Sequence, residues 1–116
     1  MARKNTHSHK MINATSMGAT ITSAATSVKN MDKAGILVEW SAGSTPVGVV
    51  TVQARFSPTG NYVDLDFGSA INVSGNSGSH QIRLDELPFQ DIRVVYTRTS
   101  GSGTLNVTVV IKQVGG

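Results

Sequence analysis

Between Val50 and Phe56 every second residue is apolar and the residues between them are polar, which gives a strict period of two. Successive side chains of a β-strand point to opposite faces of the sheet, so this period predicts a strand with one buried and one exposed face. A helix would instead repeat its apolar residues about every 3.6 positions. The chain holds no such helical pattern for longer than one turn.

The same alternation returns along the chain, and turn-forming residues separate one occurrence from the next. It predicts strands at 36–40, 50–56, 63–67, 82–84, 92–96 and 105–111, with a weaker edge strand at 19–28. Proline and glycine at 58–61 predict a turn, and the glycines at 100–103 predict a hairpin loop. We therefore expect an all-β fold: an antiparallel β-sandwich or jelly roll of seven to eight short strands with an extended N-terminal arm.

The inward positions of these strands form the predicted structural core. Its members are Ile36, Val38, Trp40, Val50, Val52, Phe56, Leu65, Phe67, Ile92, Val94, Tyr96, Leu105, Val107, Val109 and Ile111. Two further apolar residues, Val95 and Val110, fall on outward positions. They are expected either under a covering strand or at an interface.

Composition agrees with one sheet-rich domain. The 116 residues include 12 glycines, and only 15% are charged, against about 25% in an average soluble domain. The chain has no cysteine, which excludes a disulfide framework and a zinc ribbon. No apolar run approaches the roughly 20 residues that span a bilayer, and no apolar stretch follows the basic start, so neither a membrane segment nor a signal peptide is expected.

Charge divides the chain into two parts. Residues 1–31 hold four lysines and arginines and no acidic residue, whereas residues 32–116 hold six basic and seven acidic residues. We therefore predict an extended basic N-terminal arm at 1–17 and a β-sandwich domain at 18–116. The arm is expected to bind a neighbouring subunit, with packing on its own domain as the alternative. Its predicted partner-binding residues are Arg3, Lys4, Lys10, Met11, Ile12 and Met17.

The sequence offers little catalytic chemistry. It lacks a Gly-x-Ser-x-Gly elbow, and the occurrence of Ser, His and Asp together is expected by chance in a chain so rich in Ser. His7 and His9 could share one side of a strand but make only two metal ligands, and Asp64 and Asp66 are better explained as a polar outer face paired with Arg55 or Arg83. We expect no catalytic residue, no metal and no cofactor, and so no enzyme.

Nucleic acid is not an expected partner either. The arm carries four positive charges without interleaved aromatic residues, which would give only weak, salt-dependent phosphate binding.

From Ile36 to Val114 the chain resembles small virion proteins of tailed bacteriophages. The resemblance lies in the order of its motifs: the strand with Trp40, then 45–54, 62–67, 87–89 and 92–106. It implies a β-sandwich structural subunit of the particle without catalytic activity. Such proteins serve as head decoration proteins and as tail or fibre components.

From this resemblance we expect a virion protein, a capsid decoration or cement subunit that binds and stabilises the assembled head. Its expected partners are other virion proteins, chiefly the major capsid protein, and further copies of itself, with no membrane. The alternative is a tail or fibre-associated module with a glycan as candidate ligand, because Trp40 and Tyr62 could stack on sugar rings. Trp40 alternates with Ile36 and Val38, however, which favours a place in the core. A third possibility is a small secreted or cell-surface sandwich with hydrolase activity, but the sequence shows no catalytic constellation that would support it.

Overall fold

The computed structural model describes residues 5–28, 31–65, 71–84 and 89–113, and this part of the chain is built of antiparallel strands without a helix. The strands are β1 (Asn5–Ser16), β2 (Ile21–Thr22), β3 (Thr26–Ser27), β4 (Lys33–Arg55), β5 (Val63–Asp64), β6 (Ile71–Val73), β7 (Gly78–Leu84) and β8 (Asp91–Gln113). The predicted all-β antiparallel sandwich is confirmed. Within these residues no helix is long and apolar enough to cross a bilayer.

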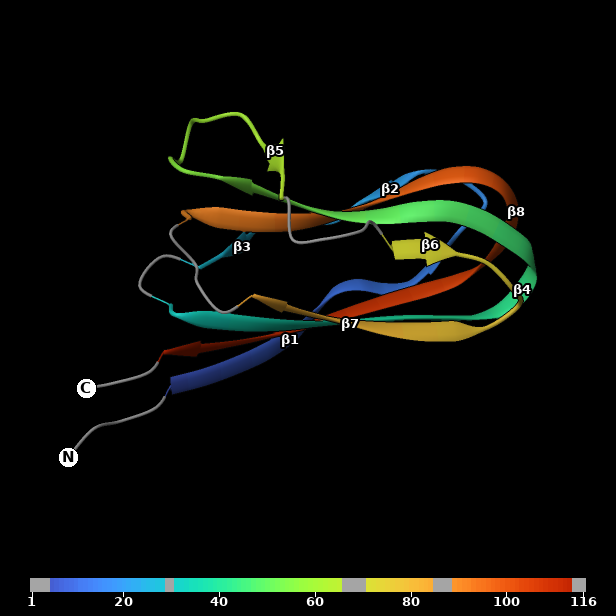
Figure 1. Cartoon of the computed structure of the whole chain (residues 1–116), viewed down its shortest axis with the longest axis horizontal. Coiled ribbons are helices and arrows are strands. Elements are labelled where there is room, and N and C mark those ends of the chain that lie inside the picture. Colours follow the sequence, from blue (N-terminus) through green and yellow to red (C-terminus); the bar gives the residue numbers. More distant parts are fainter. Residues whose placement is uncertain (1–4, 29–30, 66–70, 85–88, 114–116) are drawn as a thin grey trace.

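Two long strands, β4 and β8, carry the architecture. They pair with each other from Lys33↔Lys112 to Arg55↔Asp91, and both bend midway so that each contributes to two layers (Figure 1). The β1–β7 layer holds β1, β8 from residue 104 onward, β4 up to residue 41, and β7. The β2–β6 layer holds the remaining halves of β8 and β4, with β2 and β3 on one edge and β5 and β6 on the other.

The bend lies where the sequence predicted a hairpin loop, and that prediction is wrong. Residues 100–103 continue β8, opposite Ser44 and Val47 of β4. Gly101 has a φ of +77° and Thr45 a φ of +47°, and a Cβ on Gly101 would collide with the Thr45 carbonyl group. Glycine permits both a tight turn and a bulge. Here it lets two paired strands bend together.

Residues 5–16, which the sequence analysis assigned to an arm, form β1 at the edge of the β1–β7 layer and pair with β8 of the same chain. The alternative that this segment packs on its own domain is therefore the one the structure shows. Register shifts between Lys10 and Ile12 mark a bulge. A bulge lets two consecutive side chains face the same side, and both Met11 and Ile12 are buried.

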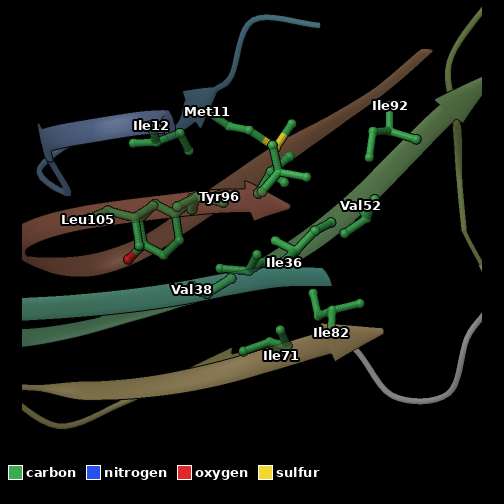
Figure 2. Packing of buried hydrophobic residues seen from close by; sticks show 14 of the residues in the cluster. Met11, Ile12, Ile36, Val38, Val52, Ile71, Ile82, Ile92, Tyr96 and Leu105 are labelled. Atoms are coloured by element: carbon green, nitrogen blue, oxygen red, sulfur yellow. The ribbon is translucent and has the colours of Figure 1, made fainter. Parts of the chain in front are cut away.

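The core lies between the two layers. Figure 2 shows side chains from β1, β4, β6, β7 and β8 gathered there. The buried members of the predicted core are Ile36, Val38, Trp40, Val50, Val52, Ile92, Val94, Tyr96, Leu105, Val107, Val109 and Ile111. Leu65 is half-buried against this cluster, and Phe67 lies outside the described residues.

The prediction of Phe56 as a core residue is wrong, because its side chain is 68% exposed. Phe56 continues the inward alternation of β4 but lies beyond Arg55, the last residue of that strand. Its ring has an edge-to-face contact with Phe89, with centroids 5.4 Å apart. The alternation in the sequence thus continues one apolar position beyond the end of β4, where the side chain is no longer buried.

Candidate interaction surfaces

The residues predicted to bind a partner through the arm do not form one exposed surface. Met11, Ile12 and Met17 are 8%, 3% and 0% exposed and belong to the chain's own core. Lys10 is exposed and donates hydrogen bonds to Asn13 and Asn106. Arg3 and Lys4 lie outside the described residues.

The outer face of the β2–β6 layer carries a polar network. Arg55 Nε donates to Asp91 Oδ2 over 2.7 Å, and the aspartate is 7% exposed. Arg93 Nε donates to Gln53 Oε1, and Gln53 Nε2 donates to Asp64 Oδ1, each over 2.8 Å. Asp64 therefore has a different partner from the arginines predicted for it.

Tyr62 completes this network. The guanidinium carbons of Arg93 and Arg55 lie 4.0 Å and 5.0 Å from its ring centroid, within the range of cation–π attraction. Its hydroxyl oxygen is buried without a hydrogen-bond partner among the described residues. We call the set Gln53, Arg55, Tyr62, Asp64, Asp91 and Arg93 the arginine–tyrosine network. The two positive charges of its arginines equal in number the two negative charges of its aspartates.

Neither aromatic residue considered for glycan binding has a free ring. Trp40 is 5% exposed and stacks on His80, with centroids 6.2 Å apart and planes 15° apart. Tyr62 is half-buried beside two guanidinium groups. A sugar would have to displace these neighbours, so the geometry does not favour the glycan hypothesis.

Of the candidate metal ligands, the structure describes the side chains of His9 and Asp64. His9 Nε2 lies 3.0 Å from Thr26 Oγ1, an interaction within the fold. Nothing is described for the His7 side chain, and Asp66, Asp85 and Glu86 lie outside the described residues. Among the residues that are described, no three His, Asp or Glu side chains gather as a metal site would need.

A groove crosses the outer face of the β1–β7 layer. Its wider part, ≈ 440 Å³, is lined by Lys33, Ala34, Gly35, Arg83, Leu84, Val110 and Lys112. A narrower part, ≈ 270 Å³, continues past Leu37 and Thr108, and the two parts share Gly35, Arg83 and Val110. We call this the Gly35 groove.

Strand register explains how the Gly35 groove forms. Gly35 lies opposite Arg83 of β7 on one side and Val110 of β8 on the other. A Cβ at Gly35 would meet no atom within 4 Å, so the missing side chain leaves open space at the centre of the sheet face. Val110, which the sequence placed on an outward position, is half-buried in the wall of this space.

One end of the Gly35 groove is basic. Lys33 and Lys112 face each other across β4 and β8, and Arg83 lies in the next row on β7. The described residues give these three cations no ion pair, and Asp32, the neighbour of Lys33 along the chain, has an interaction of its own. The sequence did not reveal this site, because Gly35 directly precedes the strand predicted at 36–40 and only the structure shows it inside β4.

Comparison with known proteins shows the fold and no family. No protein-family model and no curated protein sequence matches the chain. The SPBc2 prophage-derived protein YomS is structurally similar, with a TM-score of 0.61 and 14% identity, over 95% of this chain and 96% of that chain.

A chain in the structure of infectious bursal disease virus, Gx strain, is also similar, with a TM-score of 0.65 and 11% identity. The match covers 98% of this chain but 34% of the viral chain, so this chain corresponds to about a third of it. At these identities the likeness concerns the fold.

Proposed function

We propose that this chain is a structural subunit of a tailed-bacteriophage particle and that it binds the assembled head as a decoration subunit. Its role is mechanical rather than catalytic, and its partners are other virion proteins, chiefly the major capsid protein, together with further copies of itself. The observation that carries the proposal is the fold shared with a prophage-derived protein over nearly the full length of both chains. The similar domain within a virus structure supports it.

The architecture suits such a role. Because β4 and β8 each pass through both layers, the layers are joined by two continuous, mutually paired strands and not only by side-chain packing. A decoration subunit that binds the assembled shell more tightly than the free shell protein stabilises the shell by mass action. A rigid body makes such binding efficient because little conformational entropy is lost on attachment.

Stripping and re-adding the subunit tests the proposal. Phage heads are freed of the protein and heated in a calorimeter with and without purified protein. We expect the protein to rebind and to raise the temperature at which the heads open. Heads that neither rebind the protein nor change in thermal stability would contradict the decoration role.

Electron microscopy of intact particles then places the subunit. Density for the sandwich on the shell lattice supports decoration. Density on the tail or on fibres, together with unchanged head stability, would assign the chain to the tail or fibre-associated alternative instead. A glycan array on purified protein tests the remaining candidate ligand of that alternative.

A further inference from the structure

The Gly35 groove has the size of a peptide site. It runs along β4 from the row of Lys33 to the row of Leu37. Four steps of a strand cover about 13 Å, so about four residues of an extended chain would fill it. Its two parts, ≈ 440 Å³ and ≈ 270 Å³, provide room for side chains.

The narrower part favours aliphatic groups. Leu37, Val110 and the methyl-bearing Thr108 line it, and all three are half-buried on a sheet face that no described strand covers. Because Gly35 has no side chain, a ligand group can reach the backbone between them. Apolar surface that a ligand removes from water here contributes to its affinity.

The wider part favours an anion. Like charges placed directly across two strands destabilise a sheet, and Lys33 is directly opposite Lys112. Arg83 adds a third positive charge in the adjoining row. A carboxylate bound among them would relieve this repulsion and accept charge-assisted hydrogen bonds, which are stronger than neutral ones.

The mixed lining distinguishes a peptide from a nucleic acid. The residues of the groove include no aromatic ring on which a base could stack. An apolar groove next to a cationic end instead matches an extended segment that carries one acidic side chain and aliphatic side chains at every second position. Alternate side chains of an extended chain point the same way, so one face of such a segment can contact both parts.

We propose that the Gly35 groove binds an extended acidic segment of a partner protein, with a carboxylate among Lys33, Arg83 and Lys112 and an aliphatic side chain above Gly35. The identity of that partner as a shell protein rests on the proposed function; the peptide specificity does not. The groove thereby becomes the attachment surface of the sandwich.

Short blocked peptides test the specificity directly. The pentapeptides Glu-Ser-Val-Ser-Val and Val-Ser-Val-Ser-Glu cover both chain directions, and versions with Gln in place of Glu are the controls. Each is titrated into the isotopically labelled full chain and followed by NMR. We expect one acidic peptide to shift the amide signals of Gly35, Val110 and Lys112, and its Gln version to bind about tenfold more weakly.

Matched variants locate the site. Lys112→Gln should weaken the acidic peptide about tenfold, whereas Arg98→Gln, which removes an exposed cation from the β2–β6 layer, should leave its affinity unchanged. Gly35→Val should abolish binding by filling the groove, since a Cβ there meets no protein atom. Thr97→Val, which replaces a hydroxyl group with a methyl group at an exposed position of the other layer, is its control.

The outcomes separate the inference from the proposed function. No saturable peptide shifts, or equal effects of Arg98→Gln and Lys112→Gln, would overturn the groove assignment. So would a DNA duplex that shifts the same amides as strongly as the acidic peptide. Wild-type protein that stabilises stripped heads, combined with a Gly35→Val variant that does so equally well, would overturn the groove and leave the decoration role intact. Peptide binding by a protein that never rebinds heads would overturn the decoration role and leave the groove assignment intact.

Discussion

The outer faces of the two layers use charge in opposite ways. On the β2–β6 layer, the two arginines and two aspartates of the arginine–tyrosine network are linked through Gln53 and Tyr62 into a neutral assembly. On the β1–β7 layer, Lys33, Arg83 and Lys112 surround the Gly35 groove without an ion pair among the described residues.

The difference separates stability from recognition. A network whose members satisfy one another contributes to folding and offers little to a partner. Three cations that have no ion pair among the described residues contribute little to folding, or oppose it slightly, and the proposed anion would make them favourable. The two faces should therefore respond in opposite directions to substitution.

The largest effect is expected from Arg55→Ala in the network. The substitution leaves the Asp91 carboxylate, 7% exposed, without its 2.7 Å partner. We expect a loss of about 2 kcal/mol in the free energy of unfolding, since the arginine side chain is partly solvated. Urea denaturation measures it. Arg83→Ala in the groove should change stability by less than about 0.5 kcal/mol, and equal losses for both variants would break the comparison.

Tyr62→Ala comes next. It removes the ring that lies beside both guanidinium groups, and we expect a loss of about 1–2 kcal/mol. Tyr62→Phe is the matched variant: it keeps the ring and deletes a buried hydroxyl that has no partner among the described residues, so stability should hold or rise. Thermal melts of both proteins decide the point, and a loss in Tyr62→Phe as large as that in Tyr62→Ala would refute the role given to the ring.

The inner side of the β2–β6 layer should be sensitive to alkali through Tyr96. Burial raises the pKa of this phenol above its ordinary value of about 10, and the positive charge of Arg98 lowers the pKa in part. The folded state therefore holds the proton more tightly than the unfolded state. Stability is fully present below about pH 10 and is lost as the pH rises through the folded pKa.

Tyr96→Phe removes this dependence. It also removes the hydroxyl that donates to the Val47 carbonyl oxygen over 3.4 Å, so a loss of about 1 kcal/mol is expected at neutral pH. Unfolding curves at pH 8 and pH 11 compare the two proteins. An alkaline loss that is as steep in Tyr96→Phe as in the parent would assign the effect to another group.

On the groove side, Gly35→Val should stabilise the fold while it blocks the proposed ligand. Glycine inside a strand costs about 0.5–1 kcal/mol, and valine suits a sheet face. Because a Cβ at Gly35 meets no atom within 4 Å, we expect a gain of that size in urea denaturation. A loss of stability would show that the groove is needed for folding.

The smallest effect is expected from Lys112→Glu. It replaces a pair of like charges across β4 and β8 with a pair of opposite charges, worth about 0.2–1 kcal/mol in favour of the folded state. The gain should shrink in high salt, which screens surface charge. Melting temperatures at low and high salt provide the measurement, and destabilisation at low salt would contradict the repulsion inferred between Lys33 and Lys112.

Local alternation predicted the fold class and the buried residues of β4 and β8, because the two faces of a strand differ within a few residues. It did not predict the bend at Gly101, since glycine is suited to hairpins and bulges alike and only the pairing of Ser100 and Ser102 with β4 decides between them. The arm at 1–17 was predicted from the positive charge of the N-terminal segment, but residues 5–16 pair with β8, and the bulge in β1 buries both Met11 and Ile12.

The candidate site escaped prediction for a related reason. Lys33, Arg83 and Lys112 are far apart in the sequence, and strand register brings them into adjoining rows. The sequence did expose one element of it, the outward position of Val110, without showing which residues surround it.

The pairing of Asn5 with Gln113 gives the molecule a direction of mechanical weakness. The first residue of β1 lies opposite the last residue of β8, so tension applied between these two residues would break the hydrogen bonds of the pair one after another. A load directed along the two strands in opposite senses would instead have to shear many of those bonds at once. A subunit of this design therefore resists tension along its strands far better than tension that pulls Asn5 away from Gln113.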